Sequence, residues 1–528
     1  MKNLLLTIYF LSVFFCSSAE TINLKSFGGK SDGKTSNTQI IKKAIDKLTA
    51  DGGGTLYFPA GTYLTGPIKL ENNITIDIES GATILFSGEY EEYTPFVEMR
   101  YEGVVMKSFC PLFYAYEKEY ITIKGRGKID GNGAHWWHVA WAMDGIEKYA
   151  PLLKRVAPLQ ELWDKENPNL KIEEKSDWKR TLAKKFFRPP FIQMYKSKNI
   201  LIEGITIVNS PFWTINPEFC ENVTVKGVSI FNPYSPNTDG INPSSCKDVH
   251  ISDCHISVGD DCITLKSGRD LQGREYATPC ENVTITNCTM LAGHGGVVIG
   301  SEMSGDVRKI TISNCIFDGT DRGIRIKSTR GRGGIVEEIR VSNIVMKNIK
   351  KEAITLNLFY SNVPAEPISD RTPIFKNIHF SNLTGSDINA ACTIWGIEEA
   401  PISNITFTDI NMDAKTGFDI DKAKNLTFTD VQVNATLSPS FTIKNSENIQ
   451  INNVYTLQPN SEKSLISLTD TKDVFINRCF PLNGSQSFLK LEGATTNNII
   501  LIGNYLKRLN QGIEKSQNLN PNAIIIEQ

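Results

Sequence analysis

The sequence predicts an all-β protein whose strands wind into a parallel β-helix. Three observations support this prediction. After residue 190 a pattern of alternating apolar residues recurs many times, each copy is split by a polar pair rich in Asn, Asp and Gly, and successive copies begin 21 to 39 residues apart, mostly in the twenties. A repeat of this length and composition is typical of a solenoid.

Each copy has the pattern of two short strands joined by a tight turn. Alternation of period two indicates strands with one buried face, and Asn, Asp and Gly tolerate the left-handed backbone of a turn. Because one copy cannot bury its apolar face alone, we expect the copies to stack coil on coil around a continuous core. A β-propeller is the rival architecture, but its repeats are longer and carry four strands each. The copies include K-N-I-L-I-E-G-I-T-I (198–207), E-N-V-T-V-K-G-V-S-I (221–230), K-D-V-H-I-S-D-C-H-I (247–256), E-N-V-T-I-T-N-C-T-M (281–290), R-K-I-T-I-S-N-C-I-F (308–317) and K-N-L-T-F-T-D-V (424–431).

The start of the chain predicts a cap for this solenoid. Residues 37–51 have helical spacing, with Ile41, Ala44, Ile45 and Leu48 on one face, and three glycines at 52–54 end the helix. An open solenoid end needs a cover. We therefore expect a helix over 37–51 to close the N-terminal end.

Residues 1–19 have the features of a secretory signal peptide. Lys2 supplies a positive charge, residues 4–16 are almost wholly apolar, and Ser17, Ser18 and Ala19 offer a small-residue cleavage site. We expect cleavage after Ala19, export to the periplasm or the medium, and a single catalytic domain over 20–528. Cys16 leaves a lipid-anchored alternative, and no later stretch is long and apolar enough to span a membrane.

The overall charge argues against two classes of partner. The formal net charge is −2 with 22% charged residues. A near-neutral chain gives no reason to expect nucleic acid or an anionic membrane as a partner. An anionic substrate must therefore be held by local cations.

Ten cysteines follow residue 19, and an exported protein permits disulfides. Many of them fall in strand-like contexts between 246 and 315, and their spacing does not resemble a zinc site. We favour small buried side chains stacked in the core over a disulfide framework. The ten are Cys110, Cys220, Cys246, Cys254, Cys262, Cys280, Cys288, Cys315, Cys392 and Cys479.

The ladder of repeats is interrupted at about 132–190. This stretch is charged and partly helical in pattern, and it holds five of the seven tryptophans, namely Trp136, Trp137, Trp141, Trp163 and Trp178. Insertions in solenoids project from one face, which is often the binding face. Aromatic rings stack on sugars but also pack ordinary helices, so both roles stay open.

Two neighbouring carboxylates, Asp260 and Asp261, follow Gly259 in a stretch that otherwise alternates like a buried strand. Neighbouring coils lie about 4.8 Å apart, so residues one repeat apart can meet in space. Asp239 lies 21 residues before Asp260, which is one short coil. The three acids are therefore predicted to form one cluster, although Asp-Asp after Gly is also a common solvated turn.

Three further charged or titratable residues follow on the next coils. His294 lies in the glycine-rich bend A-G-H-G-G (292–296), one longer coil after the acids. Arg325 and Lys327 alternate with two isoleucines in G-I-R-I-K-S (323–328), so both cations share the outward face. Each residue alone is most simply a solvated position, but their shared register favours a functional cluster.

This set of residues fits glycoside hydrolysis. That reaction needs one protonated carboxyl to protonate the leaving oxygen and a second carboxylate to activate water or attack the sugar. Crowded acids supply both states, because mutual repulsion keeps one of them protonated. Two cations beside the acids indicate a sugar that carries a carboxylate.

Four short motifs resemble the signature segments of the polygalacturonases, glycoside hydrolase family 28. They are N-T-D (237–239), G-D-D (259–261), G-H-G (293–295) and R-I-K (325–327), in that order. The segments F-P-A-G-T-Y (58–63), N-S-P-F-W-T-I (209–215) and G-S-E-M-S-G (300–305) are similar to those of bacterial members. The resemblance implies a right-handed, pectin-lyase-like β-helix that hydrolyses α-1,4-linked galacturonic acid with inversion, without a cofactor or metal.

The resemblance also implies roles for individual residues. Asp260 is the general acid, Asp239 and Asp261 activate the water, and His294 supports the protonation of the acid. Substrate binding is implied for Asn237, Arg325, Lys327 and, on weaker grounds, Tyr360 of N-L-F-Y (357–360). The substrate implied is a pectic polysaccharide or oligogalacturonide, and we expect a monomer.

The chain departs from compact endo-acting members in its larger insertion at 132–190. An insertion that blocks one end of the groove predicts an exo-acting enzyme that trims chain ends. Independently of the resemblance, we expect a disulfide bond between Cys262 and Cys288. Rival hypotheses are a rhamnogalacturonan or xylogalacturonan hydrolase, a Ca²⁺-dependent pectate lyase, and a non-catalytic glycan-binding solenoid.

Overall fold

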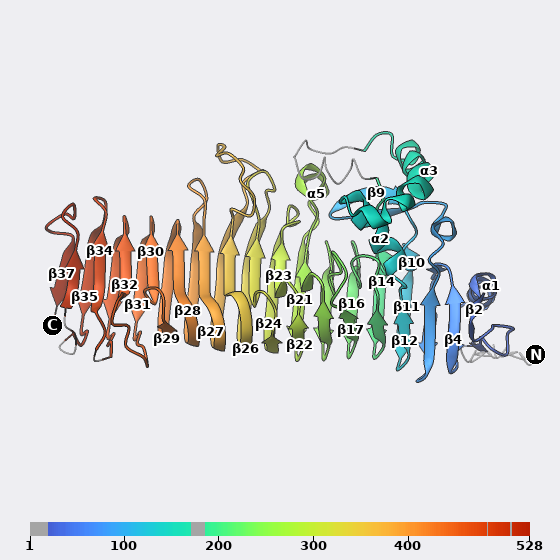
Figure 1. Cartoon of the computed structure of the whole chain (residues 1–528), viewed down its shortest axis with the longest axis horizontal. Coiled ribbons are helices and arrows are strands. Elements are labelled where there is room, and N and C mark those ends of the chain that lie inside the picture. Colours follow the sequence, from blue (N-terminus) through green and yellow to red (C-terminus); the bar gives the residue numbers. More distant parts are fainter. Residues whose placement is uncertain (1–19, 171–184, 483, 507–508, 510, 528) are drawn as a thin grey trace, which may run out of the picture.

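The computed structural model describes residues 20–170, 185–482, 484–506, 509 and 511–527. The predicted leader lies outside these residues. The strands stack into one long solenoid with the chain ends at its opposite ends (Figure 1). Its strand pairs are parallel except for one hairpin, so the predicted parallel β-helix is confirmed. Within the described part of the chain, no helix is long and apolar enough to cross a membrane.

Three faces of stacked strands form the wall of the solenoid. The first face is built from β1 (Glu20–Asn23), β3 (Gly54–Phe58), β6 (Ile74–Ile78), β11 (Glu119–Gly125), β14 (Lys198–Glu203), β16 (Glu221–Lys226), β18 (Lys247–Ser252), β21 (Cys280–Thr286), β31 (Glu447–Asn452), β33 (Lys472–Asn477), β35 (Asn497–Ile502) and β37 (Ile524–Glu527). The second face is built from β2 (Asp32–Ser36), β4 (Gly61–Thr65), β7 (Ala82–Phe86), β12 (Lys128–Asp130), β15 (Thr206–Val208), β17 (Ser229–Asn232), β19 (His255–Val258) and β22 (Thr289–Ala292).

The third face carries most of the candidate residues. It is built from β5 (Ile68–Lys69), β10 (Phe113–Tyr116), β13 (Ile192–Tyr195), β20 (Asp261–Leu265), β23 (Gly295–Gly300), β25 (Ile324–Lys327), β30 (Phe441–Lys444), β32 (Ser464–Thr469), β34 (Ser487–Glu492) and β36 (Gln511–Lys515). Five long strands bend around more than one face, namely β24 (Val307–Asp318), β26 (Ile335–Asn357), β27 (Ile374–Trp395), β28 (Ile402–Asp421) and β29 (Ala423–Ala435).

In-register stacking builds both the core and the corners. The rings of Phe380, Phe407 and Phe428 stack in the core with centroids 5.0 and 5.1 Å apart. At a corner, Asn343 has a left-handed φ of 56° and donates to the side chain of Asn314 on the preceding coil at 3.1 Å. Asn recurs in the repeats because it tolerates this backbone and bonds to its neighbour.

The cysteines also stack in register. Two columns of three neighbours lie at successive coils, Cys220, Cys246 and Cys280 in one, and Cys254, Cys288 and Cys315 in the other. All ten are buried free thiols, which confirms the favoured prediction. The expected Cys262–Cys288 bridge is wrong. Cys262 belongs to β20 on the third face, where its thiol donates to the carbonyl of Ala292, whereas Cys288 precedes β22 on the second face.

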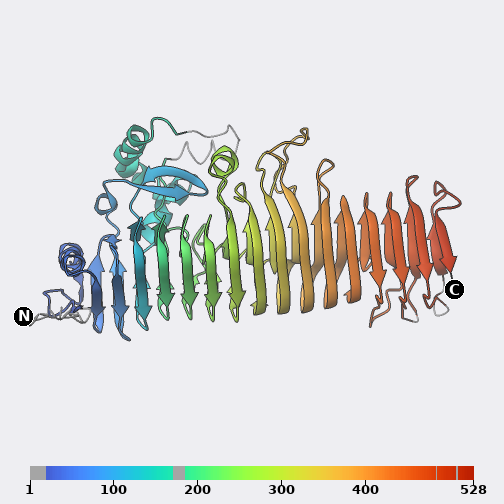
Figure 2. The same cartoon turned by 180° about the vertical axis from the view of Figure 1, so that it is seen from behind.

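The helices cap one end of the solenoid and cover one side. Helix α1 (Thr38–Ala50) buries the four predicted side chains and covers the N-terminal end. Helices α2 (Ala134–Met143) and α3 (Pro151–Glu166), with the short η2 (Glu147–Tyr149), confirm the partly helical insertion. They gather on one side of the solenoid with α5 (Asp270–Tyr276), as both views show (Figure 2).

A second interruption was not predicted. Residues after β7 form the short helix η1 (Tyr90–Tyr93) and an antiparallel hairpin, β8 (Val97–Tyr101) and β9 (Val104–Ser108). The hairpin lies on the same side as α2 and α3. Its strands are as apolar and as short as those of the ladder, so no sequence pattern marks them as leaving the wall.

The tryptophans of the insertion mainly serve packing. Trp136 is fully buried against Tyr90, Tyr93 and Phe109. Trp163 packs against Phe187. Trp178 lies outside the described residues. These aromatic contacts join the insertion to the segment of η1 and the β8–β9 hairpin, and hold its own two ends together.

Candidate active site

The start of β20 brings the three predicted acids together. Oxygens of Asp239, Asp260 and Asp261 lie within 4.8 Å of one another. Ile241 pairs with Ile263 across neighbouring coils, so the backbone of Asp239 lies beside Asp261 rather than beside Asp260. The repeat at this point is therefore 22 residues, one more than the spacing to Asp260 suggested. Asp260 occupies the turn that precedes the strand.

Each of the three acids has a cationic neighbour. Asp260 Oδ1 lies 3.0 Å from His294 Nδ1, and Asp261 Oδ2 accepts a 2.8 Å hydrogen bond from Lys327 Nζ. Asp239 Oδ2 lies 4.0 Å from Lys266 Nζ and accepts a hydrogen bond from Asn242 at 3.0 Å. Buried carboxylates are costly unless they are paired in this way. A cation bound among the acids would have to compete with these side chains.

The acids differ in how readily they hold a proton. Burial, and next the charge of Asp260, raises the pKa of Asp239 well above its usual value. Burial acts in the same direction on Asp260, but the hydrogen bond with His294 and the charges of His294 and Lys327 outweigh it and lower its pKa. The hydrogen bond with Asp260 raises the pKa of His294. In the free enzyme, Asp239 and His294 therefore hold a proton more readily than Asp260 does.

One acid oxygen is left for a further partner. Asp261 Oδ1 is buried and accepts no hydrogen bond from any described residue. Arg325 lies 3.6 Å away, which is too far for one. An acceptor of this kind, next to Asp239, suits a water molecule placed between the two carboxylates.

The acids line a cavity of about 450 Å³ whose walls come from both the solenoid and the insertions. Met143 and Asp144 at the end of α2, Arg188 after the insertion, and Glu102 in the β8–β9 hairpin line it on one side. The insertion at 132–190 thus shapes the site through Met143, Asp144 and Arg188, the last of which lies near its end. None of its four described tryptophans lines the cavity.

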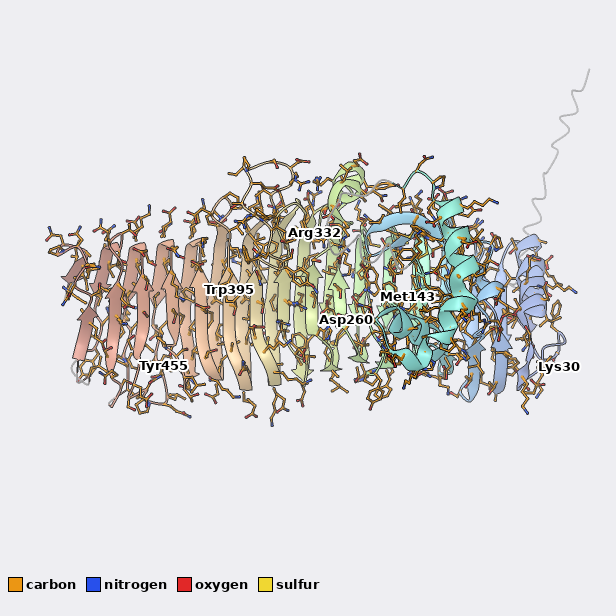
Figure 3. All side chains as sticks on the ribbon, turned by 45° about the horizontal axis from the view of Figure 1, so that its top comes forward. Lys30, Met143, Asp260, Arg332, Trp395 and Tyr455 are labelled. Atoms are coloured by element: carbon orange, nitrogen blue, oxygen red, sulfur yellow. The ribbon has the colours of Figure 1, made fainter. Side chains whose placement is uncertain are left out.

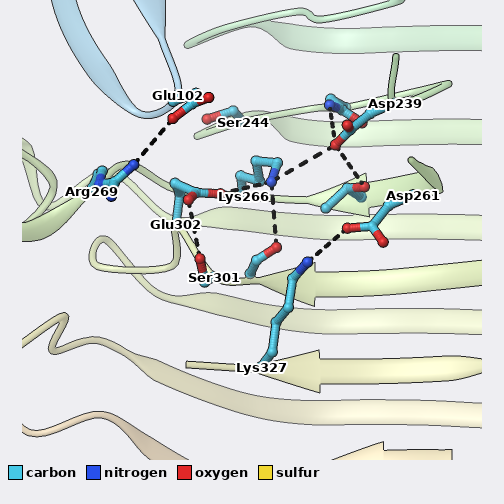
Figure 4. A network of polar contacts seen from close by, with 12 residues as sticks. Glu102, Asp239, Ser244, Asp261, Lys266, Arg269, Ser301, Glu302 and Lys327 are labelled. Carbon is cyan, nitrogen blue, oxygen red and sulfur yellow. Dashed lines mark hydrogen bonds and ion pairs between the residues drawn. The ribbon is translucent and has the colours of Figure 1, made fainter. Parts of the chain in front are cut away.

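A chain of buried ion pairs lies beside the acids (Figure 4). Lys266 donates to Glu302 at 2.7 Å and lies 4.7 Å from the ring centroid of Trp213. Burial alone would lower the pKa of Lys266, but Glu302 and Asp239 raise it on balance. Lys266 therefore stays charged and links Asp239 to the cavity wall.

Arg188 joins the insertion to the N-T-D turn. Its guanidinium donates to the carbonyls of Pro211 and Pro236 at 2.9 and 2.7 Å, and to Asn237 Oδ1 at 2.7 Å. Asn237 has a left-handed φ of 54°. Arg188 therefore holds the side chain of Asn237 in place.

The remaining predicted residues also gather around the acids. Lys327 and Tyr360 line the cavity, and the Lys327 ammonium lies 5.5 Å from the Tyr360 ring centroid. His294 and Arg325 adjoin it through Asp260 and Asp261. His294 keeps 51% of its side chain exposed. All eight predicted site residues thus lie in one region, which the label of Asp260 marks in Figure 3.

Sequence reasoning missed Lys266 and Arg188. Lys266 follows the alternation I-T-L-K (263–266), in which Thr264 and Lys266 point outward, so the argument used for Arg325 and Lys327 would have found it. Arg188 lies in F-F-R-P-P (186–190), outside the repeats, where no periodicity marks it.

Comparison of the whole chain with known proteins agrees with the chemistry of this site. Residues 169–425 match the family model described as glycosyl hydrolases family 28, and residues 21–95 match one described as rhamnogalacturonase A/epimerase, pectate lyase-like. A crystal structure of a hyperthermoactive exopolygalacturonase from Thermotoga maritima is 32% identical, with a TM-score of 0.66 over 78% of this chain and 93% of that one.

This chain belongs to glycosyl hydrolases family 28. It is therefore a glycoside hydrolase with a β-helix like that of its solved relatives. Among curated relatives, a probable polygalacturonase of Vitis vinifera is 28% identical over 404 residues, 75% of this chain and 74% of the relative. An exo-poly-alpha-D-galacturonosidase of Dickeya chrysanthemi is 28% identical over 415 residues, 74% of this chain and 67% of the relative.

The contacts of Arg188 predict that it is needed for turnover. Arg188→Lys keeps the charge but loses the planar fork that holds two carbonyls and Asn237. We expect kcat to fall at least about tenfold, since one or more buried hydrogen bonds are lost. Arg155→Lys, on the exposed surface of the same insertion, is the matched control and should leave kcat unchanged. An unchanged kcat in a folded Arg188→Lys variant would show that the fork does not hold the site.

The His294–Asp260 pair predicts the shape of the pH profile. Because the pKa of His294 is raised and that of Asp260 is lowered, the pair is fully charged between those two values. As the pH rises through the raised pKa of His294, the proton is lost and kcat/KM should fall. His294→Asn should remove this alkaline limb and lower the maximum. A pH profile of kcat/KM that keeps the same alkaline limb in the variant would contradict the assignment.

Proposed function

We propose that this enzyme hydrolyses the α-1,4-galacturonosyl linkages of homogalacturonan and acts from a chain end. The observation that carries the proposal is the convergence of three carboxylates, each matched by a cation, in a cavity with one wall supplied by the insertions. The comparisons support it, because relatives described as polygalacturonases and exopolygalacturonases match most of the chain.

In this proposal Asp260 is the general acid. Two of its neighbours can supply a proton. His294 Nδ1 lies 3.0 Å from Asp260 Oδ1, and an oxygen of Asp239 lies within 4.8 Å of one of Asp260. Because the pKa of Asp260 is lowered and those of its neighbours are raised, the proton comes from His294 or Asp239 and passes through Asp260 to the glycosidic oxygen as the bond to the sugar breaks. A proton that leaves Asp239 also frees that carboxylate to accept one from water, so the cluster can return to its starting state.

Asp261 and Asp239 activate the attacking water. Lys327 donates a hydrogen bond to Asp261 Oδ2, which leaves Oδ1 to accept a hydrogen bond from the water. Asp239 lies beside it and orients the same molecule. Lys266 stabilises the negative charge that Asp239 takes on after it gives up its proton.

The substrate carboxylate is assigned to Lys327 and Arg325. An ammonium has three donors, and Asp261 uses one of those on Lys327. Arg325 offers a planar fork, which suits bidentate binding of a carboxylate. Asn237, held by Arg188, and the exposed ring of Tyr360 complete the contacts to the sugar.

The stereochemical outcome is the part of the proposal that the spacing does not support. Typical inverting enzymes keep their carboxyl groups about 6.5–9.5 Å apart, and retaining ones about 5–5.5 Å. Here the oxygens lie within 4.8 Å. We nevertheless propose inversion, because Asp261 and Asp239 both flank the position suited to a water, and both are held in buried pairs rather than aimed at a sugar carbon.

A Ca²⁺-dependent lyase fits the site less well. The acids that would hold Ca²⁺ already contact Lys266, Lys327 and His294. The match to the model described as rhamnogalacturonase A/epimerase covers residues 21–95 and none of the acids. We further propose that the protein is exported through residues 1–19 and acts as a monomer.

The proposal is tested by incubating the purified enzyme with polygalacturonic acid in the presence of a chelator. We expect new reducing ends, no ultraviolet-absorbing unsaturated product, and β-configured product at first in the proton NMR spectrum. Asp260→Asn should lower kcat by about 10²–10⁴-fold, because it removes the general acid. Unsaturated product, or activity that chelator abolishes, would instead support the lyase. An α-configured first product would overturn the inverting assignment alone.

A further inference from the structure

One outward column of the third face runs from the acids to an exposed tryptophan. Within it, Gly300 pairs with Lys327, Lys327 with Asn357, and Asn357 with Trp395. Lys266 stands in the same column, one coil before Gly300. Because side chains in register share a direction, Trp395 points to the same side as the lysines that contact the acids.

Trp395 is held in place although it lies on the surface. Trp395 is 41% exposed to solvent, which is unusual for so large an apolar side chain. Its indole Nε1 donates to Asp419 Oδ2 at 3.1 Å, and Asp419 Oδ1 lies 3.5 Å from Lys444 Nζ. The hydrogen bond fixes the ring, and the lysine offsets a charge that would repel an anionic chain.

A short loop joins this ring to the cavity. Leu358 donates its backbone N–H to the carbonyl of Trp395 at 3.0 Å, and two residues later Tyr360 lines the cavity. Phe359 between them is exposed, with the guanidinium of Arg330 5.6 Å from its ring centroid. Arg330 is itself paired with Glu399, so what continues along the wall from Lys327 toward Trp395 is a row of exposed aromatic rings.

In the described part of the chain, the two directions along the solenoid from Asp260 differ in their helical cover. Helices α2 and α3 cover the wall on the N-terminal side of Asp260, whereas the wall between Asp260 and Trp395 is uncovered by helices (Figure 3). A polymer whose end lies in the cavity must place its remaining sugars along the open side. Trp395 lies four strand spacings from Asp261, roughly 19 Å along the axis.

We propose that Trp395 is a distal binding site for galacturonan, on which a sugar several units from the cleaved bond stacks. The apolar face of the pyranose would lie on the indole, with the sugar carboxylate turned toward solvent. This inference rests on the proposed function and adds to it a preference for long chains. The preference would come from binding and not from the chemical step.

The test compares KM for polygalacturonic acid and for digalacturonate in the wild type, Trp395→Ala and Trp395→Phe. We expect Trp395→Ala to raise KM for the polymer about two- to tenfold, which corresponds to the loss of one aromatic stacking contact. KM and kcat for the disaccharide should not change, because it does not reach Trp395. Trp395→Phe should recover part of the loss.

Phe231→Ala is the matched control, since Phe231 is an exposed aromatic on the second face. It should leave both KM values unchanged. Equal KM values for the polymer in wild type and Trp395→Ala would overturn the distal site while leaving the hydrolase in place, and so would a parallel rise for the disaccharide. Affinity electrophoresis in polygalacturonic acid, with Asp260→Asn as background, gives a readout without turnover. There Trp395→Ala should lose retardation, and unchanged retardation would again overturn the site.

Discussion

The in-register stacking of coils about 4.8 Å apart is the constraint on which the rest of the structure depends. Each backbone pairs with the coil before and the coil after, so one position of the repeat becomes a column along the molecule. Apolar columns make the core, Asn columns make the corners, and cysteines stack because small apolar side chains fit there. Residues far apart in sequence, such as Asp239, Asp261 and Lys327, meet because they occupy neighbouring coils of one face.

The same stacking sets the electrostatics of the site. Three carboxylates this close are unfavourable unless cations share their charge. Lys266 and Lys327 stand in one outward column and each reaches a different acid, while His294 reaches the third. The insertions then cover these groups, which strengthens every charge interaction and raises the pKa of Asp239. Catalysis and burial thus depend on the same pairs.

Much of this could be predicted from the sequence, for a physical reason. Alternation and repeat length report the stacking directly, so the solenoid, the helix α1 and the cluster of Asp239, Asp260 and Asp261 were all expected. The pairing of Asp239 with Asp261 was not, because one extra residue in a turn changes the register without changing the pattern. Parts that leave the repeat carry no periodic signal. The β8–β9 hairpin and Arg188 were missed on that account, and the sequence left open whether the tryptophans of the insertion bind sugar or pack helices.

Our central proposal is that the cavity takes the end of a galacturonan chain and not its middle. The most direct measurement is the size distribution of products during the first few per cent of the hydrolysis of polygalacturonic acid. A single small product from the earliest time, with the remaining polymer nearly full length, is the result predicted if the insertions block one end of the groove. A ladder of intermediate oligomers at the same stage would show that the chain crosses the site, and that the insertion does not close it.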